Sequence, residues 1–292
     1  MDFETFKQKI KEEMQFRLGT GSVEIRETIK NNSVKRTGMI LSRPGDEASP
    51  VIYLDAWHEK LCGGKGFGET VEEIWGLYLQ HAGKMPLDKG EFMDWKRVRK
   101  KVSVRLVHYQ KNREMLEDVP HRRFLDLAEA YYFTAETGMD GFAAVLITDS
   151  HMDYWGICQR ELREAAYENH KKNGGTKIQT MDKVIREMLG APADSGCSPM
   201  QMYVATNRFQ LGGAAAMLFA GEFSGLAQEL GSDLYILPSS IHEILLLPVS
   251  AGKPEELAEI VKEVNRTQVM PEERLSDSVY LYERESGEVR IA

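Results

Sequence analysis

Apolar side chains at the start of the chain recur every three or four residues, at Phe3, Phe6, Ile10 and Met14. This spacing is typical of an amphipathic helix with one buried stripe, and it predicts a helix over residues 3–17 behind an Asp2 cap. The pattern then changes to that of strands. Residues 22–26 and 34–42 predict a hairpin that turns at Asn31-Asn32.

The next segments continue a small α/β module. The β-branched residues 50–54 predict a third strand of the same sheet, and residues 69–79 return to helical spacing. Phe92, Trp95 and Val98 indicate a helix that leads into an alternating strand at 102–107. For residues 123–133 the aromatic end favours one strand over a helix.

The rest of the chain is predicted to alternate between strands and helices. Asp140-Gly141 is a good hairpin turn, and residues 190–199 are the clearest loop. We expect strands at 142–148, 202–206, 214–219, 233–237 and 243–248, helices at 158–171, 181–189, 222–230 and 254–264, and a terminal hairpin of 278–282 with 289–291.

The short connection at 238–242 decides the fold class. A parallel crossover needs about a dozen residues, so the strands on either side of this connection must be antiparallel or angled. We therefore expect an α+β fold with mixed or antiparallel sheets and packed helices, rather than a doubly wound nucleotide fold. Two α/β modules are expected, at residues 1–118 and 119–292.

Composition narrows the class of protein. The 292 residues include 45 acidic and 37 basic ones, a formal charge of −8, which argues against nucleic-acid binding. No stretch approaches the roughly 20 apolar residues of a membrane span, and the N-terminus lacks an apolar signal core. The three cysteines, Cys62, Cys158 and Cys197, allow neither a disulfide framework nor a zinc knuckle, so a cytoplasmic location is expected.

Motifs for cofactors and metals fail their spacing tests. The glycine-rich segment 63–70 has Lys65 followed by Gly66, whereas a P-loop needs Ser or Thr after the lysine. Neither His58-Glu59 nor His242-Glu243 continues into a zinc-protease motif. We therefore expect no cofactor and no metal ion.

The first candidate site is the polar group His121, Arg122, Arg123 and Asp126. In a strand, Arg122 faces away from His121 and Arg123 and shares a face with Asp126. Such a group suits either an anion-binding corner or an ion-pair network with a purely structural role.

The second candidate is the strand-to-strand corner that contains Ser239, Ser240, His242 and Glu243. Loops between strands often present functional groups, but the same serines suit a turn in which hydroxyls bond to the local backbone. No G-x-S-x-G motif exposes either serine as a nucleophile. We expect the two candidate groups to share one cleft.

Several long stretches, residues 119–128, 230–243, 265–269 and 275–280, resemble DUF5688, a bacterial family of unknown function. The similarity runs nearly end to end. The resemblance implies a cytosolic protein and supplies no activity, cofactor or catalytic residue.

Two functions remain open, and we favour the first. One is a non-enzymatic protein that binds a partner protein or a small anionic ligand through the two candidate groups. The other is a hydrolase or transferase with His121 or His242 as base, Ser239 or Ser240 as nucleophile, and Arg122 or Arg123 holding an anion. A structural or assembly role is a third possibility, and Tyr280-Leu281-Tyr282 could then pair with a second copy.

Overall fold

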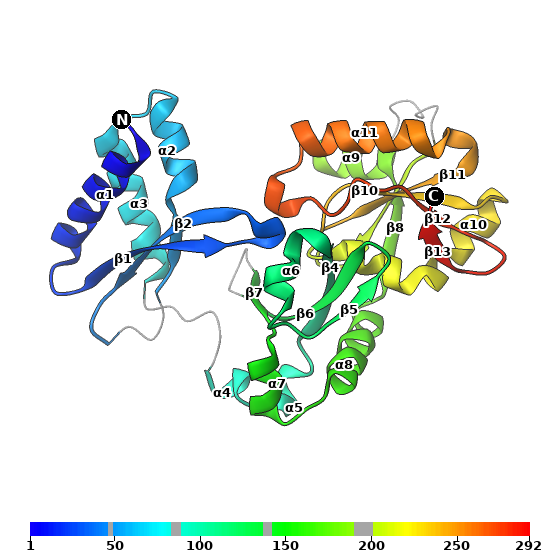
Figure 1. Ribbon diagram of the computed structural model, residues 1–292, viewed down its shortest axis with the longest axis horizontal. Helices are drawn as coiled ribbons and strands as arrows, with labels where there is room; N and C mark the ends of the chain where they lie inside the picture. The colour runs from blue at the N-terminus through cyan, green and yellow to red at the C-terminus, as the bar shows by residue number, and fades with distance from the viewer. Residues whose placement is uncertain (46–48, 83–88, 137–141, 190–200) are drawn as a thin grey trace. The chain divides into compact units, whose positions relative to one another are not determined.

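The computed structural model describes residues 1–45, 49–82, 89–136, 142–189 and 201–292 (Figure 1). The chain forms two units, Met1–Asp88 and Lys89–Ala292. Within the described residues every strand pairing is antiparallel, and helices pack on the sheets. The predicted α+β class is confirmed, and the sheets are antiparallel rather than mixed.

Unit 1 contains one three-stranded sheet in the order β1-β2-β3. Its elements are α1 (Phe3–Leu18), β1 (Ser22–Ile29), the 3-10 turn η1 (Asn31–Ser33), β2 (Lys35–Ser42), β3 (Val51–Tyr53), α2 (Leu54–Cys62) and α3 (Phe67–His81). These confirm the first predicted helix, the hairpin, the third strand and the helix at 69–79. Helix α2 was not predicted, because its first residues continue directly from β3.

The buried stripe of α1 forms the core of unit 1. Phe6, Ile10 and Met14 are fully buried, and they pack with apolar residues of the sheet and of α3, including Met39 and Ile74. Asp2 caps α1, because its carboxylate accepts a hydrogen bond from the Thr5 amide at 2.9 Å. The sequence pattern and the observed packing therefore agree residue by residue.

Unit 2 begins with a four-stranded sheet in the order β4-β6-β5, in which β7 also pairs with β6. Its elements are α4 (Lys89–Phe92), α5 (Trp95–Val98), β4 (Val102–His108), η2 (Gln110–Asn112), α6 (Arg113–Leu116), β5 (His121–Phe124), β6 (Leu127–Glu136), β7 (Phe142–Leu146), α7 (Asp149–Trp155) and α8 (Gln159–Lys172). Helix α8 packs on one face of this sheet.

Two expectations change in this sheet. Residues 123–133 do not form one strand: Phe124 pairs with Leu127, so Leu125 and Asp126 form a tight two-residue turn between β5 and β6. Leu125 has a φ of 56°, a left-handed conformation that an apolar residue rarely signals in sequence. The chain also divides at Asp88 rather than at residue 118, because β4 pairs along its whole length with β6.

The second sheet of unit 2 has the order β13-β12-β10-β11-β9-β8. The elements are β8 (Thr176–Thr180), α9 (Met181–Leu189), β9 (Tyr203–Asn207), η3 (Gly213–Phe223), α10 (Ser224–Leu230), β10 (Leu234–Pro238), β11 (Ile244–Pro248), η4 (Val249–Ala251), α11 (Pro254–Thr267), η5 (Pro271–Glu273), β12 (Tyr280–Tyr282) and β13 (Val289–Ile291). Strand β8 was not predicted. The antiparallel pair β10-β11 and the terminal hairpin are confirmed.

Both faces of this second sheet are covered, which explains why β10 and β11 are apolar at almost every position. Ile236 and Leu246 point into a core that also contains Leu106 and Leu127 of the first sheet. Leu237 and its neighbours pack instead against α11, which lies along the other face in Figure 1. The larger core of unit 2 therefore lies between its two sheets.

The strand expected at residues 214–219 is wrong, because this segment is the 3-10 helix η3. The alanine run reads as an apolar strand, but its small side chains serve close packing of a helix between the sheets. Gly213, the first residue of η3, has no room for a side chain: a Cβ there would overlap Thr206 Oγ1 and the His242 carbonyl oxygen. The expected Asp140-Gly141 turn and the loop 190–199 lie outside the described residues.

The close approach at Gly213 predicts the effect of a single methyl group. Gly213→Ala should lower the free energy of unfolding by about 1–3 kcal/mol, because the contacting groups are buried and must move apart. Gly221→Ala in the same helix is the control, since a Cβ at Gly221 meets no atom within 4 Å. Urea denaturation measures both variants, and equal stabilities would contradict the packing described here.

Candidate functional site

A pocket of about 510 Å³ opens between the two sheets of unit 2. Residues 100–104, at and just before the start of β4, form one wall, and α8 forms a second through Ala166, Asn169 and His170. The loop after β9 and the start of η3 close the third side. Its volume lies in the range of about 300–1,000 Å³ that is common for small-molecule sites.

Positive charge dominates the rim of the pocket. Lys100, Lys101 and Arg208 line it, and no aspartate or glutamate does so among the residues that the structure describes. Lys101 is neutralised by Glu91 at 2.8 Å. Lys100 and Arg208 have no carboxylate within ion-pair distance in the described part of the chain. The pocket thus carries two uncompensated cations on a chain whose net charge is −8.

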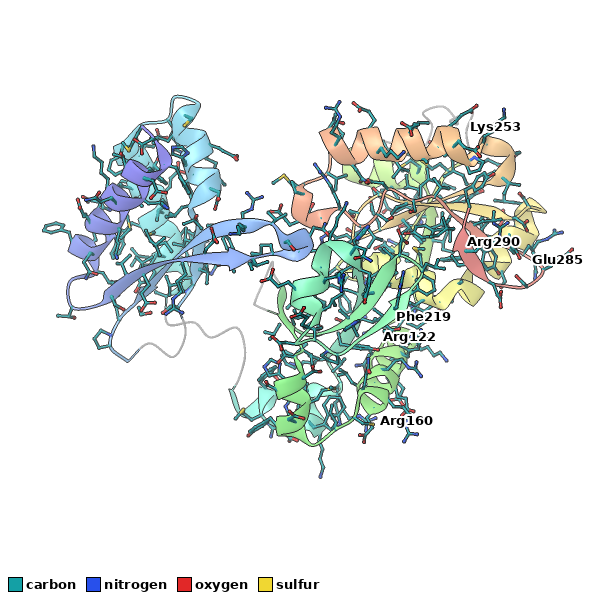
Figure 2. The ribbon with its side chains drawn as sticks, viewed as in Figure 1. Arg122, Arg160, Phe219, Lys253, Glu285 and Arg290 are labelled. Carbon is teal, nitrogen blue, oxygen red and sulfur yellow. The ribbon has the colours of Figure 1, made fainter. Side chains whose placement is uncertain are left out.

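His170 is held in the wall of the pocket by contacts on two sides. Its ring stacks on Phe219 with the centroids 3.7 Å apart, and its Nε2 lies 3.2 Å from Glu222 Oε2. Phe219 is labelled in Figure 2 beside α8. Burial raises the pKa of Glu222, but hydrogen bonds from Thr176 and His170 outweigh this effect and lower it. Glu222 therefore stays ionised and fixes the imidazole in place.

The loop after β9 is fixed by one amide side chain. Asn207 Oδ1 accepts hydrogen bonds from the Phe209 and Leu211 amides at 3.0 and 3.3 Å, and its Nδ2 donates to the Leu211 carbonyl at 2.7 Å. Asparagine commonly organises turns in this way. The loop presents Arg208 and the 38% exposed Phe209 at the rim of the pocket.

The candidate residues at 121–123 are held by other contacts. Arg122 Nε donates to Glu129 Oε2 at 3.0 Å, and Glu129 is fully buried (Figure 2 labels Arg122). His121 Nδ1 lies 2.8 Å from the Val119 carbonyl oxygen. Arg123 Nε donates to the Leu125 carbonyl at 3.1 Å.

Tyrosine hydroxyls complete the environment of Glu129. The hydroxyl of Tyr131 donates to Glu129 Oε1 at 2.7 Å. Burial, with the charge and hydrogen bond of Glu129, raises the pKa of Tyr167 to about 12. The exposed Arg122 is therefore paired with a buried carboxylate in a network that joins β5, β6 and α8.

Asp126 connects the β5-β6 turn to the C-terminal segment. Its Oδ2 accepts hydrogen bonds from the hydroxyls of Ser276 and Ser278 at 2.7 and 3.0 Å, and its Oδ1 accepts one from Tyr280 at 2.7 Å. Burial, followed by the nearby charge of Asp126, raises the pKa of Tyr280. Both oxygens of this carboxylate are occupied by the protein itself.

The corner between β10 and β11 is also internally bonded. Ser239 Oγ donates to Glu243 Oε1 at 3.3 Å, and Ser240 Oγ accepts from the His242 amide at 3.0 Å. His242 Nδ1 accepts from the Gly212 amide at 3.2 Å, and its Nε2 lies 3.9 Å from Glu273 Oε1. Burial lowers the pKa of His242, and the charge of Arg105 adds to the decrease.

None of the eight predicted site residues lines the described pocket. One residue outside the two candidate groups, Arg105, is linked to a member of each. Arg105 and His121 both pair with Ala130, so their side chains lie on one face of the sheet, and Arg105 also acts on His242. The shared cleft stays a prediction.

Sequence reasoning missed the residues that form the pocket. Lys100-Lys101 and Arg208-Phe209 are short local signals that read as solvated loop residues. Their proximity depends on the packing of two sheets, which no local pattern encodes. The one usable signal was Gly212-Gly213, since paired glycines after a strand often mark a close approach of the backbone.

Comparison with known proteins gives a family and nothing narrower. The model of a family of unknown function, DUF5688, matches residues 3–284. No curated protein and no solved structure matches the chain. In the described parts, no helix is long and apolar enough to cross a membrane, and no group of three or more His, Cys, Asp or Glu side chains is placed to hold a metal ion.

The role of Asp126 predicts a loss of stability. Asp126→Ala should lower the free energy of unfolding by about 1–3 kcal/mol, because it removes the acceptor for three hydroxyl groups. Asp153→Ala, at an exposed position of α7, is the matched control and should have little effect. If urea denaturation gives the two variants equal stabilities, Asp126 does not have this role.

The environment of His242 predicts a dependence on pH. Its pKa is lowered in the folded protein, so folding favours the neutral ring, and the stability from this site is lost as pH falls below the ordinary value of 6.5. Protonation at Nδ1 also breaks the bond from Gly212. Between about pH 7.5 and about pH 5.5, the wild type should lose more stability in urea than His242→Asn, whose side-chain oxygen can accept from Gly212 without titrating. Equal losses would contradict this assignment, since all other histidines are common to both proteins.

Proposed function

The chain belongs to DUF5688, and from the geometry of its pocket we propose that unit 2 binds a small organic anion there. The observation that carries this proposal is the combination of two uncompensated cations, Lys100 and Arg208, with a pocket wall that has no described carboxylate. A pocket of this composition attracts negative charge even in an acidic protein, because the local field outweighs the distant charges that solvent screens.

The apolar part of the pocket lining defines the other half of the ligand. Val102, Val104, Ala166, Ala215 and Ala216 line the pocket and are buried apolar residues. The alanines leave space that larger side chains would fill. An apolar body with a terminal acidic group therefore fits better than a fully polar anion such as free phosphate.

Two hydroxyl groups also line the pocket. Ser103 and Thr134 line the pocket, and each hydroxyl already donates to a backbone carbonyl, at 3.4 and 3.0 Å. Both hydroxyl oxygens keep lone pairs that can accept a hydrogen bond from a ligand. These groups would orient a bound molecule without adding charge.

Binding of 8-anilinonaphthalene-1-sulfonate, an organic anion with an aromatic body, tests this function. The double variant Lys100→Ala/Arg208→Ala should weaken binding about tenfold or more, because it removes both uncompensated charges. The matched control is Lys171→Ala/Lys177→Ala, which removes two exposed lysines that do not line the pocket. Fluorescence titration of the full chain gives the dissociation constants.

The outcomes separate pocket binding from nonspecific adsorption. Wild-type affinity should fall as salt is raised, and the control variant should follow the wild type. Equal weakening in both double variants, or no change in either, would show that the dye does not use the pocket and would refute the proposed function.

A further inference from the structure

Strand β4, whose first residues form one wall of the pocket, has an outer edge with which no described strand pairs, and this edge is called the free edge below. Among the residues that the structure describes, β4 lies at the end of its sheet and pairs with β6 alone. The Thr134 amide donates to the Lys101 carbonyl at 3.0 Å, and the Tyr109 amide donates to the Asp126 carbonyl at 3.0 Å. In an antiparallel pair, hydrogen-bonded positions alternate, so the odd-numbered residues of β4 bond to β6. The backbone groups of the even-numbered residues therefore point away from the sheet.

Two side-chain hydrogen bonds, one at each end of β4, confirm that the carbonyls of even-numbered residues point away from β6. Asn169 Nδ2 donates to the Val102 carbonyl at 2.9 Å, and Asn112 Nδ2 donates to the His108 carbonyl at 2.8 Å. Between these two positions, the outward N–H and C=O of Val104 have no hydrogen-bond partner among the described residues. Val104 is only 6% exposed and lines the pocket.

Buried backbone groups are rarely left without a partner, because each one costs the free energy of a lost hydrogen bond. At Val104 the open side is the pocket. A ligand with its own backbone-like N–H and C=O can satisfy both groups at once, as an added strand does at the edge of a sheet.

The positions of the two lysines select a direction for such a strand. Lys100 and Lys101 precede β4 and line the same wall. A strand that runs antiparallel to β4 ends with its C-terminus beside these lysines, and antiparallel pairing is the more stable arrangement. The wall from residue 100 to residue 104 spans about three to four residues of an extended chain at ~3.4 Å per residue.

We propose that the pocket binds the last three or so residues of a peptide, which pair with the free edge of β4 through Val104 and place their terminal carboxylate beside Lys100. The inference rests on the proposed function, because it names the class of organic anion that the pocket takes. The small side chains of Ala166, Ala215 and Ala216 leave room for an apolar peptide side chain in the pocket.

A peptide library tests the proposal on the full chain. An equimolar library of N-acetyl tripeptides with free carboxylates is incubated with the wild type and with Lys100→Ala, and retained peptides are identified by mass spectrometry. A subset enriched on the wild type over Lys100→Ala is expected. Lys171→Ala, the control variant, should retain the same subset as the wild type.

Two chemical changes to the retained peptides separate edge pairing from simple anion binding. Amidation of the terminal carboxylate should weaken binding about tenfold or more, and so should N-methylation of the backbone amide that faces Val104. To find that amide, each peptide is N-methylated at each position in turn. The proposal is overturned if the C-terminally amidated peptide binds as tightly as the free acid. It is also overturned if N-methylation weakens binding at none of the positions.

The dye titration distinguishes failure of the peptide proposal from failure of the proposed anion-binding function. If the sulfonate dye binds in a manner that depends on Lys100 and Arg208, but no tripeptide is enriched or displaces it, the pocket takes organic anions and the peptide assignment is wrong. If peptides are enriched equally on the wild type and on Lys100→Ala, retention is nonspecific and the assignment is also wrong.

Discussion

The pairing of β6 with three other strands is the constraint on which the organisation of unit 2 depends. Strand β6 is ten residues long, and β4, β5 and β7 all hydrogen-bond to it. Because a strand has only two edges, β5 and β7 pair with successive stretches of one edge of β6, and β4 pairs with residues 127–133 along the other. No other strand in the described part of the chain then covers the outer edge of β4. The pocket lies where η3 and α8 approach this edge, to which α8 contributes the side-chain hydrogen bond of Asn169 to the Val102 carbonyl.

Much of the fold could be predicted because its signals are local. The stripe of α1, the turn at Asn31-Asn32 and the apolar strands β10 and β11 are encoded by spacing and by turn chemistry. The failures occur where a segment takes its form from distant contacts. The alanines of η3 read as a strand because apolar content alone cannot show that Gly213 must pack against Thr206 and His242.

The residues of the pocket could not be predicted from the sequence, for a similar reason. The polar residues at 121–126 and 239–243 are close together in the sequence, but most of their donors and acceptors bond to other groups of the protein. Arg122 is paired with a buried glutamate, and Asp126 accepts hydrogen bonds from three hydroxyl groups. Lys100 and Arg208 drew no attention because each stands in an ordinary loop. What distinguishes them is that no described carboxylate neutralises them, and this property depends on three-dimensional neighbours.

The corner at His242 contributes to the pocket indirectly. Its Nδ1 accepts the amide hydrogen of Gly212, which lies between two residues that line the pocket, Leu211 and Gly213. Gly212 also packs against the side chain of Arg105, where a Cβ would lie 2.5 Å from Cγ. Gly212 therefore has contacts with both sheets, one through β4 and one through the β10-β11 corner. His242 therefore holds Gly212, at the end of the loop that carries Arg208, in contact with both sheets.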